Sequence, residues 1–155
     1  GDPMEGALVA LALKAGLDQR DQTRLRRRDV IPFDAQTRRM ATLHDDGDGG
    51  AIAYVKGAPE EVISRCQTEL AHGGERPLEM ERWLDDVETL ARDGMRVLAL
   101  AQRQMPPQAS VLDFDDIAGG LVLLGLVGMI DPPRPRHGVD HACLHRRQAI
   151  RLVRH

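Results

Sequence analysis

Residues 56–60, with the sequence KGAPE, constrain the fold most, because they join a strand to a helix over a very short distance. The alternating run Ala51–Lys56 predicts a strand that ends on a lysine. Gly57 lets the backbone turn and leaves space beside it. Pro59 suits the first position of a helix, and the acidic residues after it favour the positive end of that helix. The pattern fits a pocket for a flat anionic ligand such as a nucleotide, or a junction with a structural role only.

Length and charge indicate an ordinary globular domain. A chain of 155 residues suits one domain, and a formal net charge of −3 gives no general attraction to nucleic acid or to an anionic membrane. Cys66 and Cys143 do not make a disulfide framework, so a reducing compartment is expected. The sequence shows neither a signal peptide nor an apolar run of membrane-spanning length. We expect a soluble piece, cut from a longer protein because it starts at Gly1 without an initiator Met.

Hydrophobic periodicity predicts an α+β fold, with an antiparallel sheet flanked by helices. The segment Leu78–Arg92 has the clearest helical pattern and places Trp83 in the core. A turn rich in Gly and Asp joins two alternating segments into a hairpin. The expected strands are Arg38–His44, Ala51–Lys56, Met95–Ala101 and Leu121–Ile130, with an extended stretch at Arg24–Phe33, a short helix at Glu60–Cys66, and loops at Gln67–Arg76 and Met105–Asp116.

The first residues predict a helix start. Asp2 can cap the helix, Pro3 fits its first position, and Glu5 lies three residues after the cap. Glu5 therefore has two interpretations. It closes a capping box, or its carboxylate accepts a hydrogen bond from the amine of a ligand.

Several site motifs are missing from the sequence. We find no P-loop, no dinucleotide fingerprint after a strand, and no serine nucleophile elbow. The acidic residues of the 105–116 loop suit a solvated loop. One metal hypothesis remains, because three histidines spaced four apart would share a helix face, and imidazoles bind zinc or nickel. The residues concerned are His137, His141, Cys143 and His145.

Five segments, in order along the chain, resemble the nucleotide-binding domain of P-type cation-transporting ATPases of the calcium-pump type. Together they cover the chain from Gly1 to about Pro135. The segments are 1–7 (GDPMEGA, similar to GDPTEGA with Met4 in place of Thr), 31–40 (IPFD then RRM, similar to IPFDSxxKRM), 56–60 (KGAPE), 94–99 (GMRVLA) and 128–134 (GMIDPPR).

The resemblance implies roles for particular residues. Phe33 would stack on adenine, and Glu5 would accept from its amino group. Lys56 would line the adenine pocket with Gly57 beside it, and Arg96 would reach toward the phosphates.

The remaining implied roles concern the hairpin and the hinge. Arg38 stands where the family usually carries Lys, and Arg38 and Met40 would both contact the nucleotide. The two side chains present their donors differently, so the substitution alters this contact. Asp131 and Arg134 would belong to the hinge toward the next domain.

The resemblance also implies a division of labour. Residues 1–130 would form the nucleotide-binding domain, and 131–155 the hinge and a truncated, poorly ordered start of the phosphorylation domain. The chain lacks the DKTGT motif with the phosphorylated Asp and a complete TGDG-type magnesium segment. It should therefore bind ATP without hydrolysing it, and Mg²⁺ would act in the full-length enzyme.

The implied context is a multi-pass pump at the cytoplasmic side of the cell membrane. The partners would be ATP and the phosphorylation, actuator and transmembrane domains, with no nucleic acid. Two alternatives remain open. One is a degenerate regulatory or protein-interaction module with the same fold and little nucleotide binding, and the other is a metal-binding module based on the tail histidines.

Overall fold

A computed structural model describes residues 25–130 and 150–154 of the chain. The predicted N-terminal helix with Glu5, the hinge residues Asp131 and Arg134, and the tail cluster of His137, His141, Cys143 and His145 lie outside these described residues.

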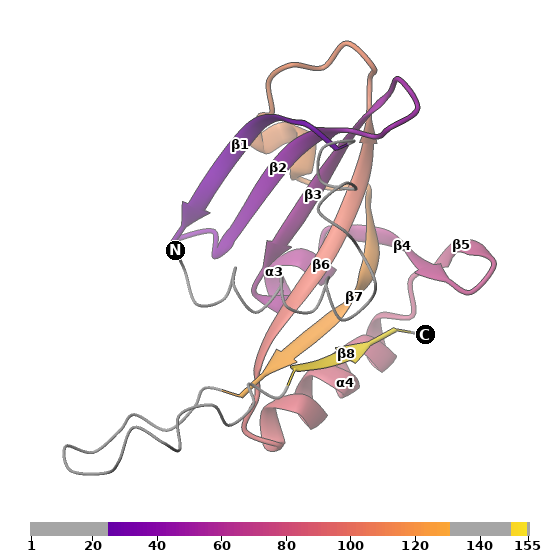
Figure 1. Cartoon of the computed structure of the whole chain (residues 1–155). Helices are drawn as coiled ribbons and strands as arrows, with labels where there is room; N and C mark the ends of the chain where they lie inside the picture. The colour runs from indigo at the N-terminus through magenta and orange to yellow at the C-terminus, as the bar shows by residue number, and fades with distance from the viewer. Residues whose placement is uncertain (1–24, 131–149, 155) are drawn as a thin grey trace, which may run out of the picture.

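The described residues form one mixed sheet with two α-helices and a 3-10 helix beside it (Figure 1). The strands follow the order β1-β2-β3-β6-β7-β4-β5, and β8 also pairs with β7. The strands are β1 (Arg27–Asp34), β2 (Arg39–Asp45), β3 (Ala51–Gly57), β4 (Cys66–Ala71), β5 (Gly74–Pro77), β6 (Arg96–Met105), β7 (Leu121–Met129) and β8 (Ile150–Val153). The helices are α3 (Pro59–Ile63), α4 (Met80–Arg92) and the 3-10 helix η1 (Phe114–Ile117).

The predicted α+β class is confirmed, with one addition. Six of the seven strand pairings among the described residues are antiparallel, and β4 pairs with β7 in parallel. β4 pairs with the first part of β7 and β8 with its last part. Residues 150–153 therefore belong to the same sheet as β1 to β7.

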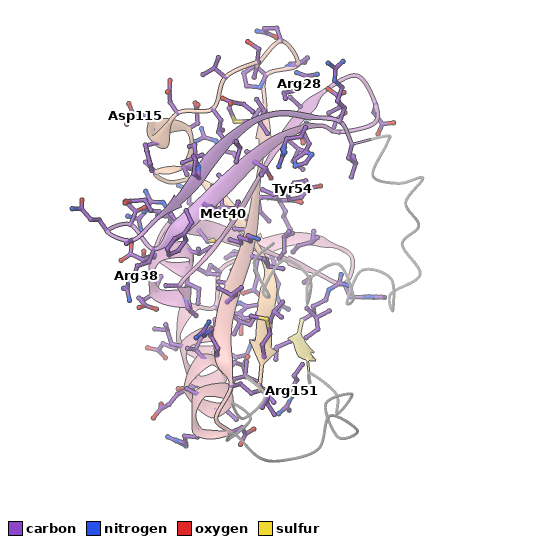
Figure 2. The ribbon with its side chains drawn as sticks, turned by 60° about the vertical axis from the view of Figure 1, so that its left-hand side comes forward. Arg28, Arg38, Met40, Tyr54, Asp115 and Arg151 are labelled. Atoms are coloured by element: carbon purple, nitrogen blue, oxygen red, sulfur yellow. The ribbon has the colours of Figure 1, made fainter. Side chains whose placement is uncertain are left out.

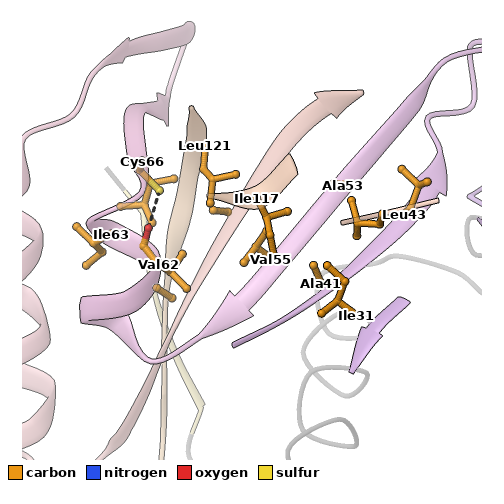
Figure 3. Packing of buried hydrophobic residues seen from close by; sticks show 14 of the residues in the cluster. Ile31, Ala41, Leu43, Ala53, Val55, Val62, Ile63, Cys66, Ile117 and Leu121 are labelled. Carbon is orange, nitrogen blue, oxygen red and sulfur yellow. Dashed lines mark hydrogen bonds between the residues drawn. The ribbon is translucent and has the colours of Figure 1, made fainter. Parts of the chain in front are cut away.

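The residues of the predicted β2–β3 hairpin alternate between the two faces of the sheet. Ala41 and Leu43 of β2, with Ala53 and Val55 of β3, are almost fully buried and belong to one hydrophobic cluster (Figure 3). Successive side chains of a strand point to opposite faces. The other face, which we call the site face, therefore carries the alternate residues of β2 and β3, among them Met40, Tyr54 and Lys56.

The helices cover the core face. Val62 and Ile63 of α3, Trp83 and Leu90 of α4, and Ile117 of η1 all join the same cluster of buried residues. The prediction that Trp83 is a core residue is thus confirmed, with 1% of its surface exposed.

Cys66 is buried within this cluster. Its thiol donates a hydrogen bond to the carbonyl of Val62 at 3.3 Å. Burial raises the pKa of Cys66 to about 12, so the thiol stays protonated at neutral pH.

The prediction of a loop at Gln67–Arg76 is wrong. β4 and β5 form an antiparallel hairpin there, which extends away from the rest of the sheet (Figure 1). Its turn contains Gly73 and Gly74, both with positive φ. The sequence does not predict a strand here because Glu69, the most buried residue of the hairpin, is charged. It breaks the apolar alternation on which strand predictions rest.

Smaller boundary differences follow from local geometry. β6 continues to Met105, beyond the predicted end at Ala101, and α3 ends at Ile63 because the chain enters β4 at Cys66. No helix among the described residues is long and apolar enough to cross a membrane.

Candidate functional site

Strand register places three of the predicted site residues in one row across the site face. Met40 of β2 lies opposite Lys56 of β3, and Lys56 lies opposite Leu100 of β6. On the outer side of β2, the pairing shifts by one residue between Ile31 and Asp34. Pro32 and Phe33 together therefore oppose Met40, as in a β-bulge.

This row combines an exposed ring with a thioether and an ammonium group. Phe33 exposes 62% of its surface, the second-largest value among the exposed large hydrophobic residues of the described chain. An aromatic ring in this position offers a flat apolar face, and Lys56 supplies a compact positive charge two strands away.

Arg96 lies on the same face, toward one end of the sheet. It opens β6 and is exposed, four residues before Leu100. At about 3.3 Å per strand residue, its Cα lies roughly 13 Å along the strand from the row of Lys56. The site face thus presents an aromatic and a lysine in one row, with an arginine farther along.

Arg38 does not lie in a strand, which corrects the prediction that β2 starts there. It ends the β1–β2 turn with φ of 48°, a left-handed conformation that residues with a side chain seldom adopt. Asp34 supports this turn, because its carboxylate accepts from the Thr37 amide at 3.0 Å and its carbonyl accepts from the Arg38 amide at 2.7 Å. The hydrogen bonds that the Thr37 and Gln36 amides donate to this carboxylate lower the pKa of Asp34.

The side chain of Arg38 is engaged by helix α3. It forms ion pairs with Glu60 at 2.8 Å and with Glu61 at 3.5 Å. Figure 2 shows Arg38 near the end of the hairpin, with Met40 and Tyr54 farther along the strands. Arg38 is therefore close in the fold to the row of Met40 and Lys56, and its charge is shared with two carboxylates.

Gly57 faces the core rather than a ligand space. It pairs with Arg39, and it is buried. A Cβ at this position would come within 2.5 Å of the Arg38 carbonyl oxygen and 2.7 Å of the Arg39 Cβ. The missing side chain thus permits the close approach of β2, whereas the sequence suggested open space beside a ligand.

We expect Gly57→Ala to destabilise the domain by about 1–3 kcal/mol, the usual cost of overpacking. The nearest atoms are backbone atoms and a Cβ, which cannot rotate away. The free energy of unfolding in urea measures the effect. Gly119→Ala is the matched control, because no atom of residues 25–130 or 150–154 lies within 4 Å of its added Cβ. Equal stability of the two variants would contradict the close approach.

Arg39 and Arg65 are charged residues near the site that the sequence did not single out. Arg39 is 6% exposed, and its Nε and Nη1 donate no hydrogen bond to any of the described residues. Its Nη1 lies 3.7 Å from Glu61, and Arg65 lies 3.1 Å from the same carboxylate oxygen. Burial, and then the neighbouring Arg65, lower the pKa of Arg39. The alternation along β2 could have predicted that Arg39 is buried, because Arg39 lies on the same face of the strand as Ala41 and Leu43.

Farther along the site face, two aromatic rings are in contact. The rings of His44 and Tyr54 meet edge to face with centroids 5.7 Å apart. Burial, with a smaller contribution from Asp46, raises the pKa of Tyr54. Tyr54 therefore stays a neutral phenol at physiological pH.

No group of three or more His, Cys, Asp or Glu side chains in the described part of the chain is arranged to hold a metal ion. Asp113 and Asp116 instead cap η1, each accepting from the backbone of the other. The tail histidines of the metal hypothesis lie outside the described residues.

Comparison with known proteins shows the family of this chain. The family model described as "P-type ATPase, cytoplasmic domain N" matches residues 1–136. The chain therefore belongs to the P-type ATPase family, as its cytoplasmic domain N.

Individual relatives agree with this assignment. The chain is 45% identical over 92% of its length to the cation-transporting ATPase pma1 of Synechocystis sp.. It is 40% identical over 94% of its length to the probable cation-transporting ATPase F of Mycobacterium tuberculosis. It is also 37% identical over 86% of its length to the human calcium-transporting ATPase type 2C member 1. The aligned segments make up 16%, 16% and 14% of these proteins, respectively.

Proposed function

We propose that this chain binds ATP on the site face, with adenine in the row of Phe33, Met40 and Lys56. In the parent pump it would deliver the gamma-phosphate to an aspartate on a separate domain. The observation that carries the proposal is the register, which brings an exposed ring and a lysine, distant in sequence, into one row. Glu5 is proposed to accept from the adenine amino group, and Asp131 and Arg134 to form the hinge.

The chemistry of the row suits a nucleotide base. Adenine has an apolar π-face that stacks on an aromatic ring, and its edge takes polar contacts. Phe33 supplies the ring and Met40 a polarisable neighbour. With adenine in this row, phosphates that run toward Arg96 stay on the same face and approach the same end of the sheet as Arg38. Gly57 contributes by holding the two strands close.

The whole protein's activity is part of the same proposal. The family and the relatives favour an ATP-driven cation pump with phosphorylation, actuator and transmembrane domains, located at the membrane with this domain on its cytoplasmic side. Mg²⁺ would accompany ATP in that full enzyme. The carboxylates of Glu60 and Glu61, beside the β1–β2 turn, already face arginines. We therefore assign no step to a metal on this chain.

The direct test is a titration of the 155-residue chain with ATP by two-dimensional NMR, without and with magnesium. Saturable shifts in residues of the row and in Arg96 would support the proposal. A folded chain without shifts at millimolar ATP would favour the degenerate module in its place.

We expect Phe33→Ala to weaken ATP binding by about 1–3 kcal/mol, or roughly 5- to 150-fold in Kd, because the variant loses the stacking surface. Phe114→Ala is the matched control, since Phe114 is also exposed but lies on η1 beside the buried Arg39. A Kd unchanged in Phe33→Ala would show that adenine stacks elsewhere.

A further inference from the structure

Five charged side chains gather where the β1–β2 turn meets helix α3. Arg38, Arg39 and Arg65 provide the positive charges, and Glu60 and Glu61 provide the negative ones. The cluster lies next to the row of Met40 and Lys56, because the Arg38 carbonyl accepts from the Ala58 amide at 2.9 Å. Its arrangement bears on how a nucleotide's phosphates would be received.

Glu61 is the centre of this cluster. One carboxylate oxygen faces Arg38, and the other faces Arg39 and Arg65. Arg65 also donates to the Glu61 main-chain carbonyl at 2.5 Å. Glu61 is therefore held in place from the core side, and its charge stays beside Arg38.

Glu60 contacts Arg38 from a more exposed position. It makes the shorter ion pair, 2.8 Å, and 55% of its side chain is exposed. Among the described residues, the ion pair of Glu60 is with Arg38, which is itself exposed, so its charge can be removed without leaving a buried arginine alone.

We propose that Glu60 and Glu61 form a carboxylate clamp that competes with the phosphates of a bound nucleotide for Arg38. This inference rests on the proposed function, because it concerns the phosphate side of the same site. Arg38 and Arg96 lie toward the same end of the sheet from the row of Lys56. Phosphates running toward that end would meet Arg38 already paired with these two carboxylates.

The clamp predicts selectivity between ligands. It weakens the binding of polyphosphates and leaves adenosine unaffected, because adenosine carries no charge to compete for Arg38. Removing the charge of Glu60 should therefore tighten ATP binding alone. An exposed ion pair contributes little, so we expect a two- to five-fold decrease in the Kd for ATP, about the range for such pairs. The effect should shrink as salt is added.

The test uses the 155-residue chain and measures the Kd of ATP and of adenosine by calorimetry or NMR at low ionic strength. The variants are Glu60→Gln, Arg38→Gln and the double variant. Glu88→Gln is the matched control, because it removes the same charge from an exposed ion pair, that with Arg92 on α4.

The expected result is tighter ATP binding in Glu60→Gln, unchanged adenosine binding, and no gain when Arg38→Gln is already present. A gain that persists without Arg38, or one that Glu88→Gln matches, would show a general charge effect and overturn the clamp. An unchanged Kd for ATP in Glu60→Gln would also overturn it. All three results leave the proposed function intact, whereas a parent chain that binds no ATP overturns the proposed function and the clamp together.

Discussion

Glu69→Gln is expected to lower the free energy of unfolding by about 3–5 kcal/mol, the usual cost of breaking a buried charge network from one side. Glu69 lies in β4 with 1% of its surface exposed. Its carboxylate accepts hydrogen bonds from four groups: Trp83 Nε1 at 2.5 Å, Arg76 Nε at 2.7 Å, the Glu79 amide at 3.1 Å and Arg82 Nη2 at 3.1 Å.

The network explains why an isosteric amide cannot replace the carboxylate. Glutamine has one acceptor oxygen, and its NH2 group would face a donor from the protein. The connection between the β4–β5 hairpin and the start of α4 would be lost together with the charge that balances Arg76 and Arg82.

Urea unfolding measures the effect, with Glu81→Gln as the control. Glu81 lies in the first turn of α4, near the point where Glu69 contacts that helix, but it is exposed. Similar stabilities of the two variants would show that the hairpin and α4 are held together without this carboxylate.

Glu69 also makes the free energy of unfolding depend on pH. Burial raises the pKa of Glu69, but the hydrogen bonds from Trp83, Glu79 and Arg76 outweigh burial, so the pKa falls below its ordinary value of 4.5. A lowered folded-state pKa gives a contribution that is fully present above the unfolded-state value and is lost as pH falls through the folded-state value. The difference in stability between the parent chain and Glu69→Gln should thus be constant from neutral pH to about pH 5 and shrink in more acidic solution.

The hairpin at the centre of the site could be predicted from sequence because its two strands follow a simple rule. Residues of β2 and β3 alternate between the core and the site face, and a turn rich in Gly and Asp fixes their register. That alternation was enough to place Lys56 on the site face. The α4 helix was predicted for a similar reason, since its apolar residues recur at helical spacing around Trp83.

What the sequence did not reveal depends on charged residues in unusual places. Glu69 and Arg39 are buried, although charged side chains are expected at the surface unless they are paired. Hence the sequence predicts a loop where β4 lies, and it gives no sign of the charge cluster around Glu61. Arg38 was assigned to the strand because nothing in its sequence indicates the positive φ that places it in the turn.

Arg39→Met is expected to raise the free energy of unfolding by about 1–4 kcal/mol, the range seen when buried ionic groups give way to apolar ones. The Arg39 guanidinium lies 3.7 Å from Glu61, too far for a hydrogen bond, and its Nε has no hydrogen-bond partner in the described part of the chain. A Met side chain would fill similar space without that desolvation cost, and its sulfur could replace the 6.0 Å contact of Arg39 with the Phe114 ring.

Arg65→Met is the matched control, because both arginines face the same oxygen of Glu61 but only Arg65 hydrogen-bonds to it. We expect this control to lose stability, whereas Arg39→Met gains it, and thermal or urea unfolding distinguishes the two signs. Glu61 keeps Arg38 and Arg65 in Arg39→Met, so its carboxylate is not left alone. A loss of stability in Arg39→Met would mean that the buried cation is well paired in the folded chain. A gain would mean that the buried charge of Arg39 destabilises the core. What Arg39 contributes would then be its effect on the neighbouring charges of Glu61 and Arg38.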